Sequence, residues 1–157
     1  MNSHKLHILI SRTDTFVGAT IRRILGGDLN HCSVAFDDDF SSLYSFSRLY
    51  QKLWFTGCFC CETTDRYSSY EVFTINITDD DYNKIMSFIS ELKQGYRVYD
   101  YIGAFLLLFN ISMHFRHNFI CSTFAAKCLS LTDTVHLDKS CYLYRPMELY
   151  NLLSDNK

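Results

Sequence analysis

Asn118-Phe-Ile-Cys-Ser-Thr-Phe-Ala-Ala-Lys-Cys-Leu-Ser-Leu131 has the spacing of an amphipathic helix with a cysteine in its first turn. The residues three, four, seven and eight positions after Cys121 are apolar and share its face: Phe124, Ala125, Cys128 and Leu129. The N-terminal end of a helix carries unpaired N–H groups and the positive end of the helix dipole, which favours a thiolate over a thiol. The segment therefore predicts a packed helix whose Cys121 points towards the core and needs only a nearby base to act as a nucleophile.

The composition indicates one globular domain that spans residues 1–157. Hydrophobic residues make up 48% of the 157 residues and charged residues 20%, which is enough for a core without disulfides or metals. The formal net charge of −2 gives no electrostatic reason to expect a nucleic-acid partner. No stretch is rich enough in proline or glycine to indicate an interdomain linker.

The cysteine content and the opening residues predict a cytoplasmic protein. Seven cysteines cannot all pair within one chain, and the opening residues lack the features of a secretion signal, so we expect reduced thiols. The longest apolar run, Ile102–Phe109, is far shorter than the ~20 residues that span a bilayer. We therefore expect no transmembrane segment, and we interpret this run as a buried helix.

The first third of the chain predicts a pair of neighbouring strands and a hairpin. Leu6–Ile10 is a short apolar strand, followed by a helical pattern that Thr13 or Asp14 could cap and that Gly26-Gly27 ends. His31–Phe36 is the next strand, and we expect it beside the first. Asp37–Asp39 then closes a turn, and Ser42–Arg48 returns as the second arm of the hairpin.

The remainder of the chain completes an α+β pattern, with an antiparallel sheet packed against helices. Tyr70–Ile77 alternates as a strand, and Thr78-Asp79-Asp80-Asp81 opens a helix in which the aspartates interact with the helix dipole. Gly95 ends that helix. Tyr142–Tyr144 is predicted as a last strand, and Arg145-Pro146-Met147-Glu148 starts a terminal helix with proline in its first turn.

His31 is the best candidate base for Cys121. A cysteine hydrolase needs a thiolate, an imidazole within hydrogen-bond reach and a third group that orients the ring. His31 begins its strand and so lies at the rim of the sheet, although a solvated imidazole at the end of a loop would have the same sequence. With the turn at Asp37–Asp39, residue 36 faces residue 40, and Ser45 lies opposite His31 as the orienting group. A shift of one residue would bring Phe46 there instead.

The cluster Cys58-Phe59-Cys60-Cys61 raises the alternative of a metal site. Structural zinc sites normally need two separated ligand pairs, and the sequence has no second pair at a suitable spacing. We interpret the cluster as small buried hydrophobic residues in a strand. No cofactor and no metal are expected.

Together these segments resemble the permuted NlpC/P60 group of papain-like proteins, with its YiiX-like and lecithin retinol acyltransferase-like branches. The resemblance covers nearly the whole chain, and it rests on the segments Ile8–Ser11, Leu29–Ala35, Leu43–Arg48, Tyr99–Gly103 and Phe119–Ala126. It implies a permuted papain-like fold in which the histidine precedes the cysteine. The third position in the family is usually His, Glu, Gln or Asn on the strand after the histidine, where this chain offers only Ser45 or Tyr44.

The resemblance implies a function for each of these residues. Cys121 would be the nucleophile and His31 the base of a hydrolase or acyltransferase that acts on an amide, peptide or ester bond through a thioester. The expected partner is a small-molecule, peptide or lipid-like acyl substrate, contacted by Tyr44, Tyr99 and Asp100. The alternative is a papain-like scaffold that has lost turnover and serves as a binding module, motivated by the weak third group and the 16% aromatic content.

Overall fold

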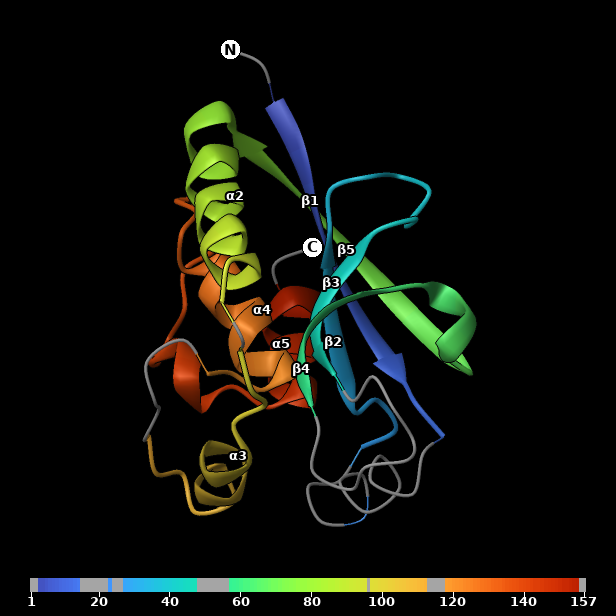
Figure 1. The fold of residues 1–157 in the computed structure, drawn as a ribbon, viewed down its shortest axis with the longest axis vertical. Coiled ribbons are helices and arrows are strands. Elements are labelled where there is room, and N and C mark those ends of the chain that lie inside the picture. Colours follow the sequence, from blue (N-terminus) through green and yellow to red (C-terminus); the bar gives the residue numbers. More distant parts are fainter. Residues whose placement is uncertain are drawn as a thin grey trace.

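The computed structural model describes residues 3–14, 23, 27–47, 57–95, 97–112 and 118–155. It is an α+β structure with one five-stranded antiparallel sheet, in the spatial order β4-β3-β2-β1-β5 (Figure 1). The strands are β1 (Ser3–Arg12), β2 (His31–Ala35), β3 (Leu43–Ser47), β4 (Cys58–Glu62) and β5 (Ser69–Thr78). The antiparallel arrangement of sheet and helices agrees with the sequence prediction.

The described part of the chain forms four α-helices, and three of them pack on the sheet from one side (Figure 1). The helices are α2 (Asp79–Lys93), α3 (Tyr101–Leu107), α4 (Cys121–Leu129) and α5 (Pro146–Asp155), with short 3-10 helices η1 (Thr64–Arg66) and η2 (Cys141–Leu143). None of these described helices is long and apolar enough to cross a membrane.

The sheet buries residues on both of its faces. Leu6, Ile8 and Ile10 of β1 point towards the helices and belong to the main core. Leu9 points to the opposite face, where it forms a smaller cluster with Ala35 and Leu43. Since successive residues of a strand alternate between faces, the continuous apolar run of β1 reflects burial on both sides.

The predicted pairing of the first two strands is confirmed. β1 and β2 run antiparallel, with Ile8 opposite Val34 and Ser11 opposite His31. The helix predicted between them lies outside the described residues. The long β5 pairs with the other side of β1 along its whole length, and it places β1 in the interior of the sheet.

The start of α2 also agrees with the sequence prediction. Thr78 Oγ1 accepts a hydrogen bond from the Asp81 N–H at 3.1 Å, and Asp81 Oδ2 accepts one from the Thr78 N–H at 3.3 Å. This reciprocal pair is a capping box. Ile85, Ile89 and Leu92 then recur at helical spacing, and all three are buried against the sheet.

The prediction of a last strand at Tyr142–Tyr144 was wrong. Residues Cys141–Leu143 form the 3-10 helix η2, and no strand of the described sheet pairs with them. Tyr142 and Tyr144 pack instead on the helical layer. Tyr142 stacks on Phe119 with 5.7 Å between ring centroids, and the buried Tyr144 hydroxyl hydrogen-bonds to Asp138. Alternating aromatic character fits a strand only where a sheet edge is available to pair with it.

The prediction that Ile102–Phe109 is buried was also wrong. These residues form α3 and the turn that follows it, at one end of the molecule (Figure 1). Leu107 is buried, whereas Ile102, Phe105 and Phe109 are exposed. Apolar character all round a helix indicates burial only if the fold places the helix between other elements, and α3 lies outside the main core.

Candidate active site

Cys121 is the first residue of α4, as its helical pattern predicts. The preceding Ile120 is extended, and its N–H donates to Thr123 Oγ1 at 3.1 Å, which fixes the start of the helix. Cys121 is 6% exposed, and the face it shares with Phe124, Ala125 and Cys128 is buried in the core. The sulfur therefore lies at the junction between the helix and the sheet.

A short segment before α3 ties this junction to the edge strand β4. The Tyr99 N–H donates to Gly57 O at 2.8 Å, and Cys58 forms an antiparallel bridge with Val98. On its other side the segment pairs with the residues that lead into α4, because the Asp100 N–H donates to Phe119 O at 3.1 Å. The position of Cys121 is thus set by backbone hydrogen bonds to the sheet, in addition to core packing.

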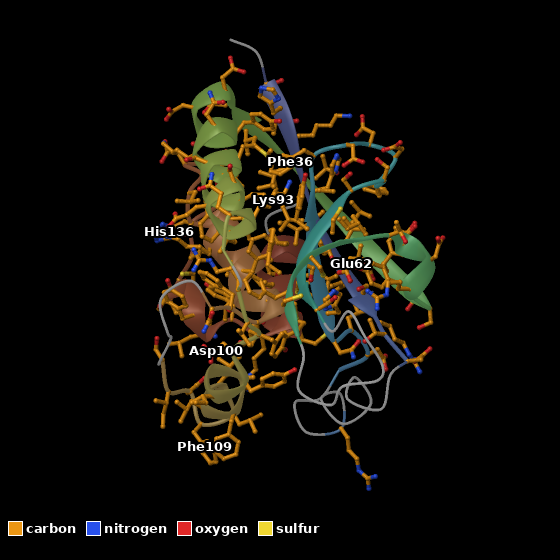
Figure 2. The ribbon with its side chains drawn as sticks, viewed as in Figure 1. Phe36, Glu62, Lys93, Asp100, Phe109 and His136 are labelled. Atoms are coloured by element: carbon orange, nitrogen blue, oxygen red, sulfur yellow. The ribbon has the colours of Figure 1, made fainter. Side chains whose placement is uncertain are left out.

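His31 is the first residue of β2, and its ring is almost fully buried at the margin of the sheet. Its Nε2 lies 2.6 Å from Oε1 of Glu62, a residue of β4, in a contact that is both a hydrogen bond and an ion pair. Figure 2 labels Glu62 beside the inner strands of the sheet. The Cys121 side chain lies close enough to the same ring to raise the pKa of His31. His31 therefore joins the helix cysteine to a carboxylate two strands away.

The charges around His31 favour its protonated form. Burial alone lowers the pKa of an imidazole, but the Cys121 thiolate and the Glu62 carboxylate raise the pKa of His31 to about 10. The buried ring is therefore held in its charged form beside Cys121.

Glu62 is held as a buried anion by several hydrogen-bond donors. Its Oε1 accepts from Ser33 at 2.9 Å and from the Tyr67 hydroxyl at 2.7 Å, and its Oε2 accepts from Ser47 at 3.0 Å. Burial by itself raises the pKa of a carboxyl group. Here His31 and these hydroxyl groups outweigh burial and lower the pKa of Glu62 to about 2.

Ser45, the predicted orienting group, does contact His31, but the predicted register is wrong by two residues. Val34 pairs with Tyr44, so that Ser45 stands opposite Ser33 instead of His31. A shift of two residues keeps a side chain on the same face. Ser45 Oγ therefore still lies 3.1 Å from His31 Nε2, and it donates to Cys32 O. Glu62 is closer to the ring and charged, so it is the stronger orienting group.

Sequence reasoning missed Glu62, although a signal was present. Cys58, Cys60 and Glu62 share one face of β4 by simple alternation, and Cys60 pairs with Ser45 in the adjacent strand. Strand pairing therefore brings Glu62 to the face that carries His31. Within the described residues, no three His, Cys, Asp or Glu side chains are grouped to hold a metal ion.

The three predicted substrate contacts lie in different surroundings, and Tyr99 is the one whose pKa Cys121 affects. Burial raises the pKa of Tyr99 well above its usual value, and the Cys121 thiolate raises it further. Tyr44 points to the helical side of the sheet, where Lys93 of α2 lies over its ring, 4.6 Å from the centroid. Asp100 is buried and caps α3, since its Oδ1 accepts the Gly103 N–H at 2.7 Å.

Fold and site together define an α+β protein that brings a cysteine, a histidine and a glutamate close together. Comparisons of the chain with protein-family models, with curated proteins and with solved structures found no match.

Proposed function

We propose that the chain is a cysteine-dependent hydrolase or acyltransferase with a permuted papain-like fold. Cys121 is the nucleophile and His31 is the base. The observation that carries this proposal is the buried His31 ring, which contacts Glu62 at 2.6 Å and lies close enough to Cys121 for that group to raise the pKa of His31. A nucleophile, its base and a group that orients the base are the three parts that covalent acyl transfer needs.

In the proposed reaction, the Cys121 thiolate attacks the carbonyl carbon of an amide, peptide or ester. The oxyanion that forms is stabilised by N–H groups of the first turn of α4, which have no partner within the helix. As the intermediate collapses, the bond to the leaving group breaks, and His31 donates its proton to that group. A thioester on Cys121 remains.

In the second half of the reaction, His31 acts as a base instead of an acid. The neutral imidazole accepts a proton from water, or from an amine or alcohol, as that molecule attacks the thioester. The product is a free acid, or a new amide or ester, and the Cys121 thiolate and His31 imidazolium are restored. Throughout, Glu62 keeps the ring oriented with Nε2 towards itself, because that contact is short and buried.

The assignment to a permuted papain-like fold is supported by the order of the parts along the chain. The histidine strand β2 comes first and the nucleophile helix α4 comes last, and α4 packs directly on the antiparallel sheet. The alternative of an inactive binding module was motivated by a weak orienting group. The contact between Glu62 and His31 supplies a charged one, and therefore favours the enzyme.

The test is covalent trapping with an activated ester, such as p-nitrophenyl acetate, followed by mass spectrometry of the peptides. We expect an acetyl adduct on Cys121 that disappears in Cys121→Ala. Cys61→Ala is the matched control, because Cys61 is an exposed thiol without a histidine partner in the described structure. Acetylation spread equally over the accessible thiols, or unchanged in Cys121→Ala, would contradict the proposal.

A further inference from the structure

The largest exposed apolar residues of the described structure gather on α3 and the turn after it. Six large hydrophobic side chains of the described structure are exposed, and five of them belong to this segment; the sixth is Tyr70 of β5. They are Tyr101, Ile102, Phe105, Phe109 and Ile111, with exposed fractions of 42% to 62%. We call these five residues the α3 tip. The segment from residue 101 to residue 112 contains no charged residue.

Side-chain hydrogen bonds hold both ends of α3 in place. At the start, Asp100 caps the helix through the Gly103 N–H. At the end, Arg145 Nη2 donates to Leu107 O at 2.9 Å and to Leu108 O at 3.4 Å. Leu107 is buried on the inner side, so the helix is apolar towards the protein and apolar towards the solvent.

The size of the α3 tip limits what can cover it. At these exposed fractions the five side chains present roughly 500 Å² of apolar surface, which is in the range where patches on single chains are usually functional. A stable protein–protein interface needs about 800 Å² from each partner, with hydrogen bonds around its rim. The tip is smaller than that, and its only side chain with a hydroxyl group is Tyr101.

We propose that the α3 tip docks the protein onto the surface of a lipid bilayer. The tip lies at one end of the molecule, and Phe109 points away from the rest of the protein there (Figure 2). Aromatic and aliphatic side chains without charges partition into the boundary between headgroups and acyl chains, which adapts to a protruding shape. A bilayer therefore needs neither a complementary protein surface nor hydrogen-bond partners in the tip.

This docking is independent of the proposed chemistry, although the two are structurally linked. Asp100, the cap of α3, bonds through its backbone to Phe119, two residues before Cys121. Docking would therefore hold the start of α4 close to the bilayer. The hydrogen bonds of His31 and Glu62 described above come from β2, β3, β4 and the segment around Tyr67, so Cys121→Ala should leave docking unchanged.

The test is co-sedimentation of the full chain with phosphatidylcholine vesicles. We expect the wild type and Cys121→Ala to partition equally, and we expect the double variant Phe105→Glu/Phe109→Glu to lose partitioning by roughly tenfold or more, because a carboxylate is costly in an apolar boundary. Tyr70→Glu adds a charge at an exposed tyrosine of β5 and is the matched control, expected to bind as the wild type does.

Three outcomes would overturn the proposal. The first is a wild type that does not sediment with the vesicles. The second is a double variant that partitions as the wild type does, or a Tyr70→Glu variant that loses as much. The third is a wild-type dimer in analytical ultracentrifugation that the double variant dissociates, which would assign the tip to a second copy of the chain. Circular dichroism of each variant controls for unfolding.

Discussion

Glu62→Gln is the substitution that tests the candidate site most directly. Glutamine has the shape of glutamate, and its amide oxygen can still accept from Ser33 and Tyr67, so the change removes a charge while leaving the packing intact. In the wild type the pKa of His31 is raised to about 10 from an ordinary value of 6.5, in spite of burial. Glu62 is the second of the two anions that raise it.

The size of the effect follows from the contact between His31 and Glu62. An opposite charge in direct contact shifts a pKa by about 1–3 units, which corresponds to roughly 1.4–4 kcal/mol of interaction. Loss of the Glu62 charge should therefore lower the pKa of His31 from about 10 to about 7–9. The sign is downward, because the lost carboxylate stabilised the protonated ring.

The assay is a pH titration of the imidazole nitrogen-15 resonances in protein labelled on histidine. A His31→Gln variant identifies the His31 signals among the six histidines. Glu71→Gln removes an exposed carboxylate of β5 and should leave the midpoint unchanged, which controls for net charge. A wild-type midpoint near 6.5, or equal midpoints in the wild type and in Glu62→Gln, would refute the reasoning.

Three further predictions concern reactivity and stability. At pH near 6, Cys121 should react with iodoacetamide at least roughly tenfold faster than Cys61, because an imidazolium favours the thiolate; peptide mapping checks this, and equal rates would count against it. Phe124→Ala should destabilise the protein by about 3–5 kcal/mol in urea unfolding, since this side chain is fully buried among the rings of the core; a loss under about 1 kcal/mol would contradict its packing. The free energy of unfolding should fall as pH rises from about 6.5 through about 10, because the raised pKa of His31 stabilises the folded state only while the ring is protonated. It should also fall as pH drops from about 4.5 towards 2, because Glu62 then takes up a proton. Chemical unfolding across this pH range tests both changes, and His31→Gln should remove most of the alkaline one.

The sequence predicted the elements whose signals are local. The helical spacing after Cys121, the capping residues of α2 and the alternation of β5 each lie within a few consecutive residues, and the structure has each element where it was predicted. Local signals gave a wrong prediction where the burial of a helix depends on its position in the fold. Ile102–Phe109 is apolar all round but mostly exposed, because burial depends on where the fold places a helix.

The residues of the candidate site also divide into those that local sequence signals could find and one that they could not. Cys121 and His31 could be found from their places at the start of a helix and of a strand, and Ser45 could be placed on the right face in spite of a register error of two residues. Glu62 could not be found in this way. Its contact with His31 depends on the pairing of β4 with β3, across a long connection whose sequence does not specify a register.

The amino-acid sequence by itself therefore determined which residues can do chemistry and on which local element each one stands. Only the tertiary structure decided that the start of α4, the start of β2 and the end of β4 meet, and that a glutamate supplies the charge at that meeting point. The physical reason is that helix periodicity and capping are fixed by neighbours along the chain. Strand order, register and burial are fixed by residues far away in the sequence.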